Sequence, residues 1–309
     1  MIIKKTDNVG LLYPLDIYRG FGSPTGELWL RTPIMNRRRF LKYSLYTGGA
    51  AALAGSYPTC IERNILTTNY YKIIIPDLPT AFNGFSIAHL TDIHFGLFVS
   101  KSFVEKIVRK TNRLNTDITV CTGDYVHARN TTQEIDAVWP ILTKLTATHG
   151  VYSVLGNHDH WADSERSKYW LNRSGQDLRH KCISIRKGSD AVFIGGAGDL
   201  WEDSLDIDKT FSDTDENACR ILLSHNPDSV DSNFKTKVSL VLSGHTHGGQ
   251  VRFPFYGAPV LPVANKKYSS GIIETPTTKL FISRGIGWAI VPIRFNCLPE
   301  IAVITLYNA

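Results

Sequence analysis

Five short apolar segments of this chain each end in side chains that commonly bind metal ions. Their length and β-branched composition predict buried strands at 85–90, 117–121, 150–155, 220–224 and 239–242. The loops that follow them carry, in chain order, Asp92 and His94, Asp124, Asn157 and His158, His225, and His245 and His247. In an open α/β sheet the carboxyl ends of the strands line the ligand-binding crevice, so we expect these loops to meet at one site.

The chemistry of these side chains indicates a pair of divalent cations. Carboxylate, imidazole and amide oxygen suit Mn, Fe, Zn or a similar ion, and the absence of cysteine from the loops argues against a structural zinc site. Two such ions roughly 3.5–4 Å apart, bridged by a carboxylate and a hydroxide, bind phosphate oxygens and lower the pKa of the attacking water. Asp124, the lone acid at the centre of the five loops, is the candidate bridge. His158 is the candidate to protonate the leaving oxygen or to stabilise the charged transition state.

Each motif alone has a structural alternative. A single Asp-x-His pair is most often a turn or a helix cap, and isolated histidines usually pack in a core or lie on the surface. Here half of the ten histidines fall in these loops (94, 158, 225, 245 and 247), and all five motifs follow an apolar segment. This clustering favours a functional site.

The series of motifs resembles the calcineurin-like metallophosphoesterase superfamily over about residues 70–309. The sequences at 91–96, 245–252, 283–287 and 292–294 are similar to a branch of exported or membrane-associated bacterial phosphoesterases, which includes relatives that cleave the diphosphate of UDP-2,3-diacylglucosamine. The resemblance implies an α/β fold, a four-layer α/β/β/α sandwich with mixed sheets. It implies that one metal is bound by Asp92, His94, Asp124 and His247. It also implies that the other metal is bound by Asp124, Asn157, His225 and His245, and that His158 lies beside the leaving group.

One position departs from the pattern of many superfamily phosphatases. They have a second aspartate three residues after the bridging one, where it orients the catalytic histidine; this chain has His127 there. Protein phosphatases continue with Arg-Gly, whereas this chain has Ala128 and Arg129. Either another group orients His158, with the adjacent Asp159 free to point away, or acid catalysis is less important. The departure also argues against a protein serine/threonine phosphatase.

The order of the other predicted elements determines the expected sheets. A capping box at 102–105 predicts the start of a first helix. A second helix is predicted to start at Thr131 and to be kinked by Pro140, and a third is predicted over 163–174. Together with the first three strands they predict a parallel β-α-β-α-β sheet. Further strands are predicted at 191–195, 271–274, 279–283 and 301–306, where turn signals favour antiparallel pairing. The apolar stretch 288–293 is either a buried strand or a loop near the active site that would suit a lipid-like substrate.

Residues 36–55 have the features of an export signal. The sequence from Asn36 to Lys42 (NRRRFLK) precedes a short, weakly apolar stretch that ends in small residues at 52–54. The paired arginines followed by Phe-Leu-Lys resemble the twin-arginine signal, and the alternative is an amphipathic surface helix with a basic start. Because Met35 stands directly before this segment, we expect translation to start there. The expected organisation is a non-native or disordered extension (1–34), a signal or anchor (35–60) and a catalytic domain (61–309).

The net charge of +6 does not indicate nucleic-acid binding. Residues 1–60 hold eight of the 34 basic residues but only three of the 28 acidic ones, so the rest of the chain is nearly neutral. A domain that binds a polyanion carries its excess positive charge on its own surface. The overall charge therefore reflects the targeting segment, and nucleic acid is not an expected partner.

These features together predict a two-metal hydrolase of phosphate esters, with phosphodiester or diphosphate bonds as the expected targets of a metal-bridging hydroxide. The alternative is a membrane-associated enzyme like the UDP-2,3-diacylglucosamine pyrophosphatases of lipid A synthesis. The non-enzymatic alternative is a metal-binding scaffold of the same fold. The expected partners are a phosphate-ester substrate, with a lipid-linked one among the candidates, the twin-arginine export machinery and a membrane surface. The expected location is the periplasm or the outer face of the cytoplasmic membrane.

Overall fold

The computed structural model describes residues 35–309, so the predicted extension 1–34 lies outside the described residues. The chain divides into two units between Ala54 and Gly55. Helix α1 (Arg37–Ser56) begins at the arginines of the predicted signal. Among the described helices, none combines the length and the apolar character that crossing a membrane requires.

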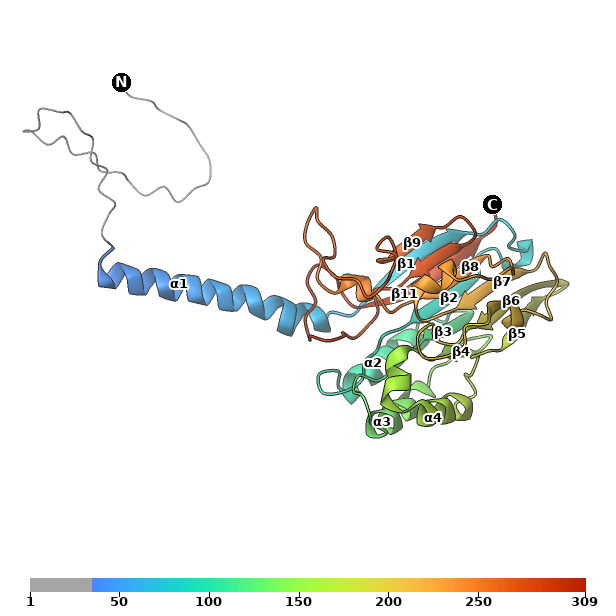
Figure 1. The fold of residues 1–309 in the computed structure, drawn as a ribbon, viewed down its shortest axis with the longest axis horizontal. Coiled ribbons are helices and arrows are strands. Elements are labelled where there is room, and N and C mark those ends of the chain that lie inside the picture. Colours follow the sequence, from blue (N-terminus) through green and yellow to red (C-terminus); the bar gives the residue numbers. More distant parts are fainter. Residues whose placement is uncertain (1–34) are drawn as a thin grey trace, which may run out of the picture. The chain divides into compact units, whose positions relative to one another are not determined.

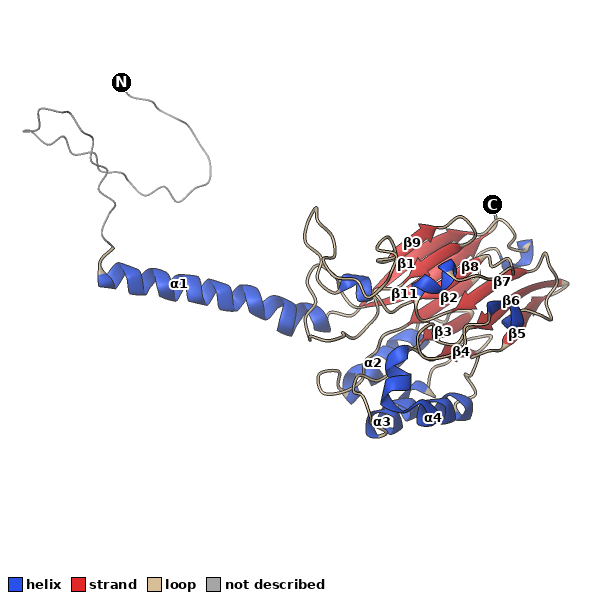
Figure 2. Ribbon diagram, viewed as in Figure 1, coloured by secondary structure: helices blue, strands red, loops and turns tan. Residues whose placement is uncertain are grey.

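Two mixed β-sheets form the centre of the second unit (Figures 1 and 2). The first has the order β1-β11-β2-β3-β4, with β1 (Thr67–Ile74), β11 (Glu300–Tyr307), β2 (Ser86–Leu90), β3 (Ile118–Thr122) and β4 (Val151–Val154). The second has the order β5-β6-β7-β8-β10-β9, with β5 (Cys182–Lys187), β6 (Asp190–Gly196), β7 (Cys219–Leu223), β8 (Leu240–Ser243), β10 (Lys279–Ile282) and β9 (Gly271–Glu274). Strands β2, β3 and β4 pair in parallel, which confirms the predicted parallel sheet of the first half.

The antiparallel pairing predicted for the later half is wrong for the middle of the second sheet. The pairs β6–β7, β7–β8 and β8–β10 are parallel, and antiparallel pairs occur at its two edges, β5–β6 and β9–β10. The crossovers from β6 to β7 and from β7 to β8 contain only short helical turns, α5 (Ile207–Thr210) and η4 (Pro227–Asp231), which leave no helical period in the sequence. Strand β1 was not predicted because it is an edge strand of mostly polar, half-exposed residues.

Three helices pack on the outer face of the first sheet, namely α2 (Lys101–Asn112), α3 (Gln133–Leu142) and α4 (Asn157–Arg173), as Figure 2 shows. Ser100, and not the predicted Ser102, caps α2, because its hydroxyl accepts from the backbone N–H of Phe103 (3.3 Å). Pro140 lies in the last turn of α3, so the hydrogen bond that its missing N–H group removes is one at the end of the helix. Helix α4 begins earlier than predicted, at Asn157, and is interrupted at Asp163 (φ −168°, ψ 105°), where the third helix was expected to begin.

Three apolar clusters separate the layers. Side chains alternate along each strand, so Ile221 and Leu223 of β7 pack between the two sheets, whereas Leu222 packs outward toward α5 and η4. In the first sheet, Ile118 and Val120 of β3 face the second sheet, whereas neighbouring Cys121 packs against the helices. Cys121 is buried there and packs as a small apolar residue. This arrangement confirms the expected four-layer sandwich, with only short helical turns in its fourth layer.

Candidate metal centre

The five predicted loops meet beside one pocket at the carboxyl ends of their strands. Strand β2 is followed by Asp92 and His94, β3 by Asp124, and β4 by Asn157 at the start of α4. Strand β7 is followed by His225, and β8 by His245 and by η5 (His247–Gly249). All seven predicted metal ligands are buried, although each is polar or charged. Burying so many polar groups costs free energy unless each has a hydrogen-bond partner or a bound ion. Such a buried polar cluster is therefore typical of a binding site.

The backbone of these loops adopts a conformation that is rare for residues with side chains. Five of the predicted ligands have positive φ angles between 48° and 67°, namely Asp92, His94, Asp124, His245 and His247. Such turns directly after a strand bring the donor atoms of these side chains close to one another. Gly123 (φ 91°) precedes Asp124, and a Cβ atom there would collide with the backbone of Gly156, so no larger residue fits.

Asp92, His94 and His247 form the first group of donor atoms. The Nε2 atom of His94 lies 3.0 Å from Nε2 of His247 and 3.9 Å from Oδ1 of Asp92. Nε2 of His247 lies 3.3 Å from the same Asp92 oxygen. Oδ2 of Asp124 is 3.5 Å from Nε2 of His94, so the central carboxylate borders this group.

Asp124, His225 and His245 form the second group. Nε2 of His225 lies 3.3 Å from Oδ2 of Asp124 and 3.1 Å from Nδ1 of His245. Asn157 is buried, and its side-chain oxygen has no hydrogen-bond partner. One carboxylate oxygen of Asp124 therefore lies against both groups, as a bridging ligand would.

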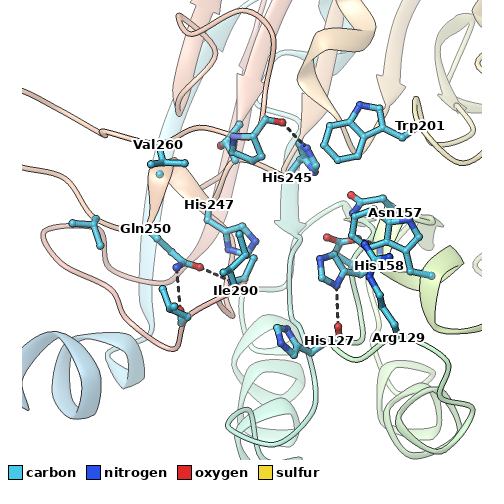
Figure 3. A pocket seen from close by; sticks show the side chains of 18 of the residues that line it. His127, Arg129, Asn157, His158, Trp201, His245, His247, Gln250, Val260 and Ile290 are labelled. Atoms are coloured by element: carbon cyan, nitrogen blue, oxygen red, sulfur yellow. Dashed lines mark hydrogen bonds between the residues drawn. The ribbon is translucent and has the colours of Figure 1, made fainter.

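The hydrogen bonds behind the ligands fix which ring nitrogen faces inward. Nδ1 of His225 donates to the carbonyl of Thr122 (2.7 Å), and Nε2 of His245 donates to the carbonyl of Pro262 (2.9 Å; Figure 3). A neutral imidazole that donates from one nitrogen has its lone pair on the other, which here is the atom inside the donor group. This pattern and the unpartnered oxygen of Asn157 fit a bound divalent cation.

The charges of the centre also suit a cation. Burial lowers the pKa of His245 to about 3 and holds the pKa values of His94 and His247 well below the ordinary value, so their lone pairs are free at pH 7. Burial disfavours ionisation of Asp124, but the neighbouring imidazoles outweigh it and hold its pKa well below the usual range. Burial likewise opposes a charge on His225, yet Asp124 raises its pKa to about 10. A divalent cation would displace the proton that this pair holds.

His158 is held at the edge of the centre by two hydrogen bonds, one from its backbone and one from its ring. Its N–H donates to Oδ1 of Asp124 (2.9 Å), and its ring Nδ1 donates to the carbonyl of His127 (2.9 Å; Figure 3). Asp159 points away and accepts from the backbone N–H groups of Asp124, Tyr125 and Gly156. The backbone carbonyl of His127 therefore orients His158, a role that the resemblance leads us to expect of an aspartate side chain at this position.

The pocket beside these residues has a volume of about 1060 Å³. Arg129, Trp161 and Trp201 line one part of it, and sequence reasoning did not identify these residues as part of the site. Only the position of Trp161, four residues after Asn157, offered a signal in the sequence. The predicted alternatives for 288–293 are resolved in favour of a loop, because Ile290 and Val291 line the pocket outside any strand.

Comparison with known proteins gives the following similarities. Residues 85–249 match the model of the calcineurin-like phosphoesterase family. The metallophosphoesterase YkuE of Bacillus subtilis is 32% identical over 88% of this chain and 98% of its own length. The phosphodiesterase YaeI of Escherichia coli is 29% identical over 88% of this chain and 100% of its own. The UDP-2,3-diacylglucosamine pyrophosphatase LpxG of Chlamydia muridarum is 26% identical over 82% of this chain and 94% of its own length.

Proposed function

The chain belongs to the calcineurin-like phosphoesterase family and is a metal-dependent phosphoesterase, and within this class we propose that it hydrolyses phosphodiester or diphosphate bonds. The observation that carries the proposal is the position of Asp124 between two groups of buried donors beside one large pocket. Two divalent cations bound there would polarise the phosphate and acidify the attacking water. The proposed ligands are Asp92, His94, Asp124 and His247 for one ion, and Asp124, Asn157, His225 and His245 for the other.

Two further side chains have the chemistry that this reaction needs. Because Nδ1 of His158 donates to a carbonyl, Nε2 is the nitrogen that faces the substrate and, in the imidazolium form, gives a proton to the leaving oxygen. The guanidinium of Arg129 lies 3.9 Å from the centre of the Trp161 ring and lines the pocket. The exposed positive charge of this guanidinium attracts the negative charge of the substrate.

The width of the pocket supports a substrate with groups on both sides of the phosphorus. In Figure 3, Val260 lies on one side of His247 and His245, and Trp201 and Arg129 lie on the other. A phosphomonoester has only one organic group and would leave one of these sides empty. A diester or a diphosphate diester has two such groups.

The proposal is tested by a substrate and metal screen of the purified full-length chain. Phosphomonoesters, phosphodiesters and pyrophosphate esters are each assayed with Mn, Fe, Zn, Mg and Ca after removal of bound metal with a chelator. We expect the metal-free protein to be inactive, and a phosphodiester or pyrophosphate ester to have the highest kcat/KM after metal is restored. A clear preference for monoesters would contradict the proposed bond specificity, and full activity without metal would contradict the proposed centre.

A lipid-linked diphosphate is the second candidate substrate. The side chains of Val260, Ile290 and Val291 give one part of the pocket an apolar lining that suits an acyl chain. The 26% identity with LpxG agrees with this chemistry. The same screen includes UDP-2,3-diacylglucosamine in detergent, and turnover of the deacylated analogue at an equal rate would argue against this candidate.

We further propose export by the twin-arginine route to the periplasm or the outer face of the cytoplasmic membrane, on the basis of residues 36–55. Changing Arg37 and Arg38 together to lysine is expected to retain most of the protein in the cytoplasm, because that route reads the arginine pair. Fractionation of cells followed by immunoblotting measures the distribution. Arg39→Lys is the matched control, since it leaves the pair intact. Unchanged export of the double variant would refute the assignment.

A further inference from the structure

Three loops near the mouth of the pocket expose large apolar side chains. We call residues 95–99, 251–263 and 288–293 the rim loops. The exposed fractions are 85% for Leu97, 75% for Tyr256 and 88% for Ile290, and Phe255 is fully exposed. Phe255 and Ile290 also have positive φ angles (65° and 63°), which are uncommon for such residues. A group of exposed apolar side chains on several loops is typical of an interaction surface.

The rim loops form one continuous face. The ring of Phe98 lies 5.5 Å from that of Trp288, which joins the first loop to the third. The side chain of Gln250 joins the second loop to the third, because it donates to the carbonyl of Val291 (3.2 Å) and accepts from the backbone N–H of Ala289. Because the second and third loops also line the pocket, whatever covers this face lies at the entrance to the metal centre.

The charges on and beside this face favour an anionic partner. The rim loops contain no acidic residue and one basic residue, Arg252. The guanidinium of Arg63 lies 5.3 Å from the ring centre of Phe98, and Lys266 and Lys267 are exposed just after the second loop. Apolar tips with a basic fringe are the features with which protein surfaces bind anionic lipid bilayers.

The chain also enters the catalytic unit at this face. The backbone N–H of Arg294, next to the third loop, donates to the carbonyl of Pro58 (3.0 Å) in η1 (Tyr57–Ile61). The side chains of Tyr57 and Ile61 are about half exposed. Residues 36–55, which carry the arginines and the small apolar stretch, directly precede this point in the sequence. If that segment binds a membrane, its attachment point keeps the rim loops close to the lipid.

We propose that the rim loops dock on an anionic lipid bilayer, so that the pocket opens onto the membrane surface. A folded protein seated on the same face would obstruct the entrance, whereas lipid molecules can surround the rim loops and still leave the pocket accessible. The consequence for catalysis rests on the proposed function: an amphiphilic phosphate ester would reach the centre from the bilayer. The docking itself does not require turnover.

Vesicle flotation of the full-length protein tests the proposal independently of hydrolysis. The vesicles contain equimolar phosphatidylcholine and phosphatidylglycerol, and the test variant combines Leu97→Ser, Phe255→Ser and Tyr256→Ser. We expect the variant to bind at least about tenfold more weakly than the wild type, because three exposed apolar side chains no longer enter the interface. The thermal unfolding midpoint of each protein verifies that it is folded.

A matched variant removes exposed apolar side chains elsewhere, from β1 and α4, by Tyr70→Ser, Ile74→Ser and Tyr169→Ser. It is expected to bind the vesicles like the wild type. Equal binding by the rim-loop variant and the wild type would overturn the proposal, because α1 alone would then account for attachment. An equal loss in the matched variant would also overturn it. Equal affinity of the wild type for pure phosphatidylcholine vesicles would refute the preference for anionic lipid.

Discussion

Asp124→Asn is expected to lower kcat/KM for metal-dependent phosphodiester hydrolysis by about 10³-fold and to reduce the bound metal. Oδ2 of Asp124 lies against His225 and His94 at 3.3 and 3.5 Å, and removing one partner from a buried charge cluster costs about 3–5 kcal/mol. Asparagine retains an oxygen that can accept from the backbone N–H of His158, so the change removes little besides the negative charge. Hydrolysis of bis(4-nitrophenyl) phosphate and elemental analysis of the purified protein measure the two losses.

Asp199→Asn is the matched control for this prediction. Asp199 is another buried acid beyond the end of a strand, β6, but its Oδ1 accepts from the backbone N–H groups of Trp201 and Glu202. Asp199 belongs to neither group of donor atoms, although its charge interacts with His225 and Asp124, so we expect Asp199→Asn to lose no more than about 10- to 100-fold in kcat/KM. If Asp124→Asn kept both its metal and its turnover, the bridging role would be wrong.

The sequence predicted which loops the structure brings together because each part of the signal is local. A buried strand must be apolar, and the loop after it must turn sharply, so strand ends such as Leu90 and Thr122 are followed by recognisable turn and ligand residues. Parallel order in the first half then brings Asp92, Asp124 and Asn157 to the same edge of the sheet. No long-range information was needed for this step.

The parts that could not be predicted depend on contacts between distant segments. The carbonyl of His127 orients His158, but a backbone group leaves no trace in the residue type. Trp201 lies over His245, with ring centres 4.5 Å apart, although the two residues belong to separate loops of the second sheet. The parallel order of that sheet was missed for a related reason: the crossovers between its central strands contain no long helix, so no helical period in the sequence marks them as parallel connections.

His158→Ala is expected to lower kcat by about 10²- to 10⁴-fold while leaving the bound metal largely intact, because a positioned general acid contributes a factor of this size. The loss should depend on the leaving group. A 4-nitrophenolate ion needs little protonation as it departs, whereas an alkoxide needs a full proton. We therefore expect a smaller loss with a 4-nitrophenyl ester than with an alkyl ester of the same phosphate, measured as kcat for both substrates.

The competing explanation is that His158 is itself a metal ligand, because its ring nitrogen lies within 4.8 Å of ring nitrogens of His94 and His127. The two roles predict different results. A ligand variant would lose metal and turnover in parallel, by the same factor for both leaving groups. A variant without its general acid would keep its metal and lose more with the poorer leaving group. His160→Ala is the matched control, since its Nδ1 is paired with the hydroxyl of Ser164 (2.9 Å), and we expect it to change neither quantity by more than a few-fold.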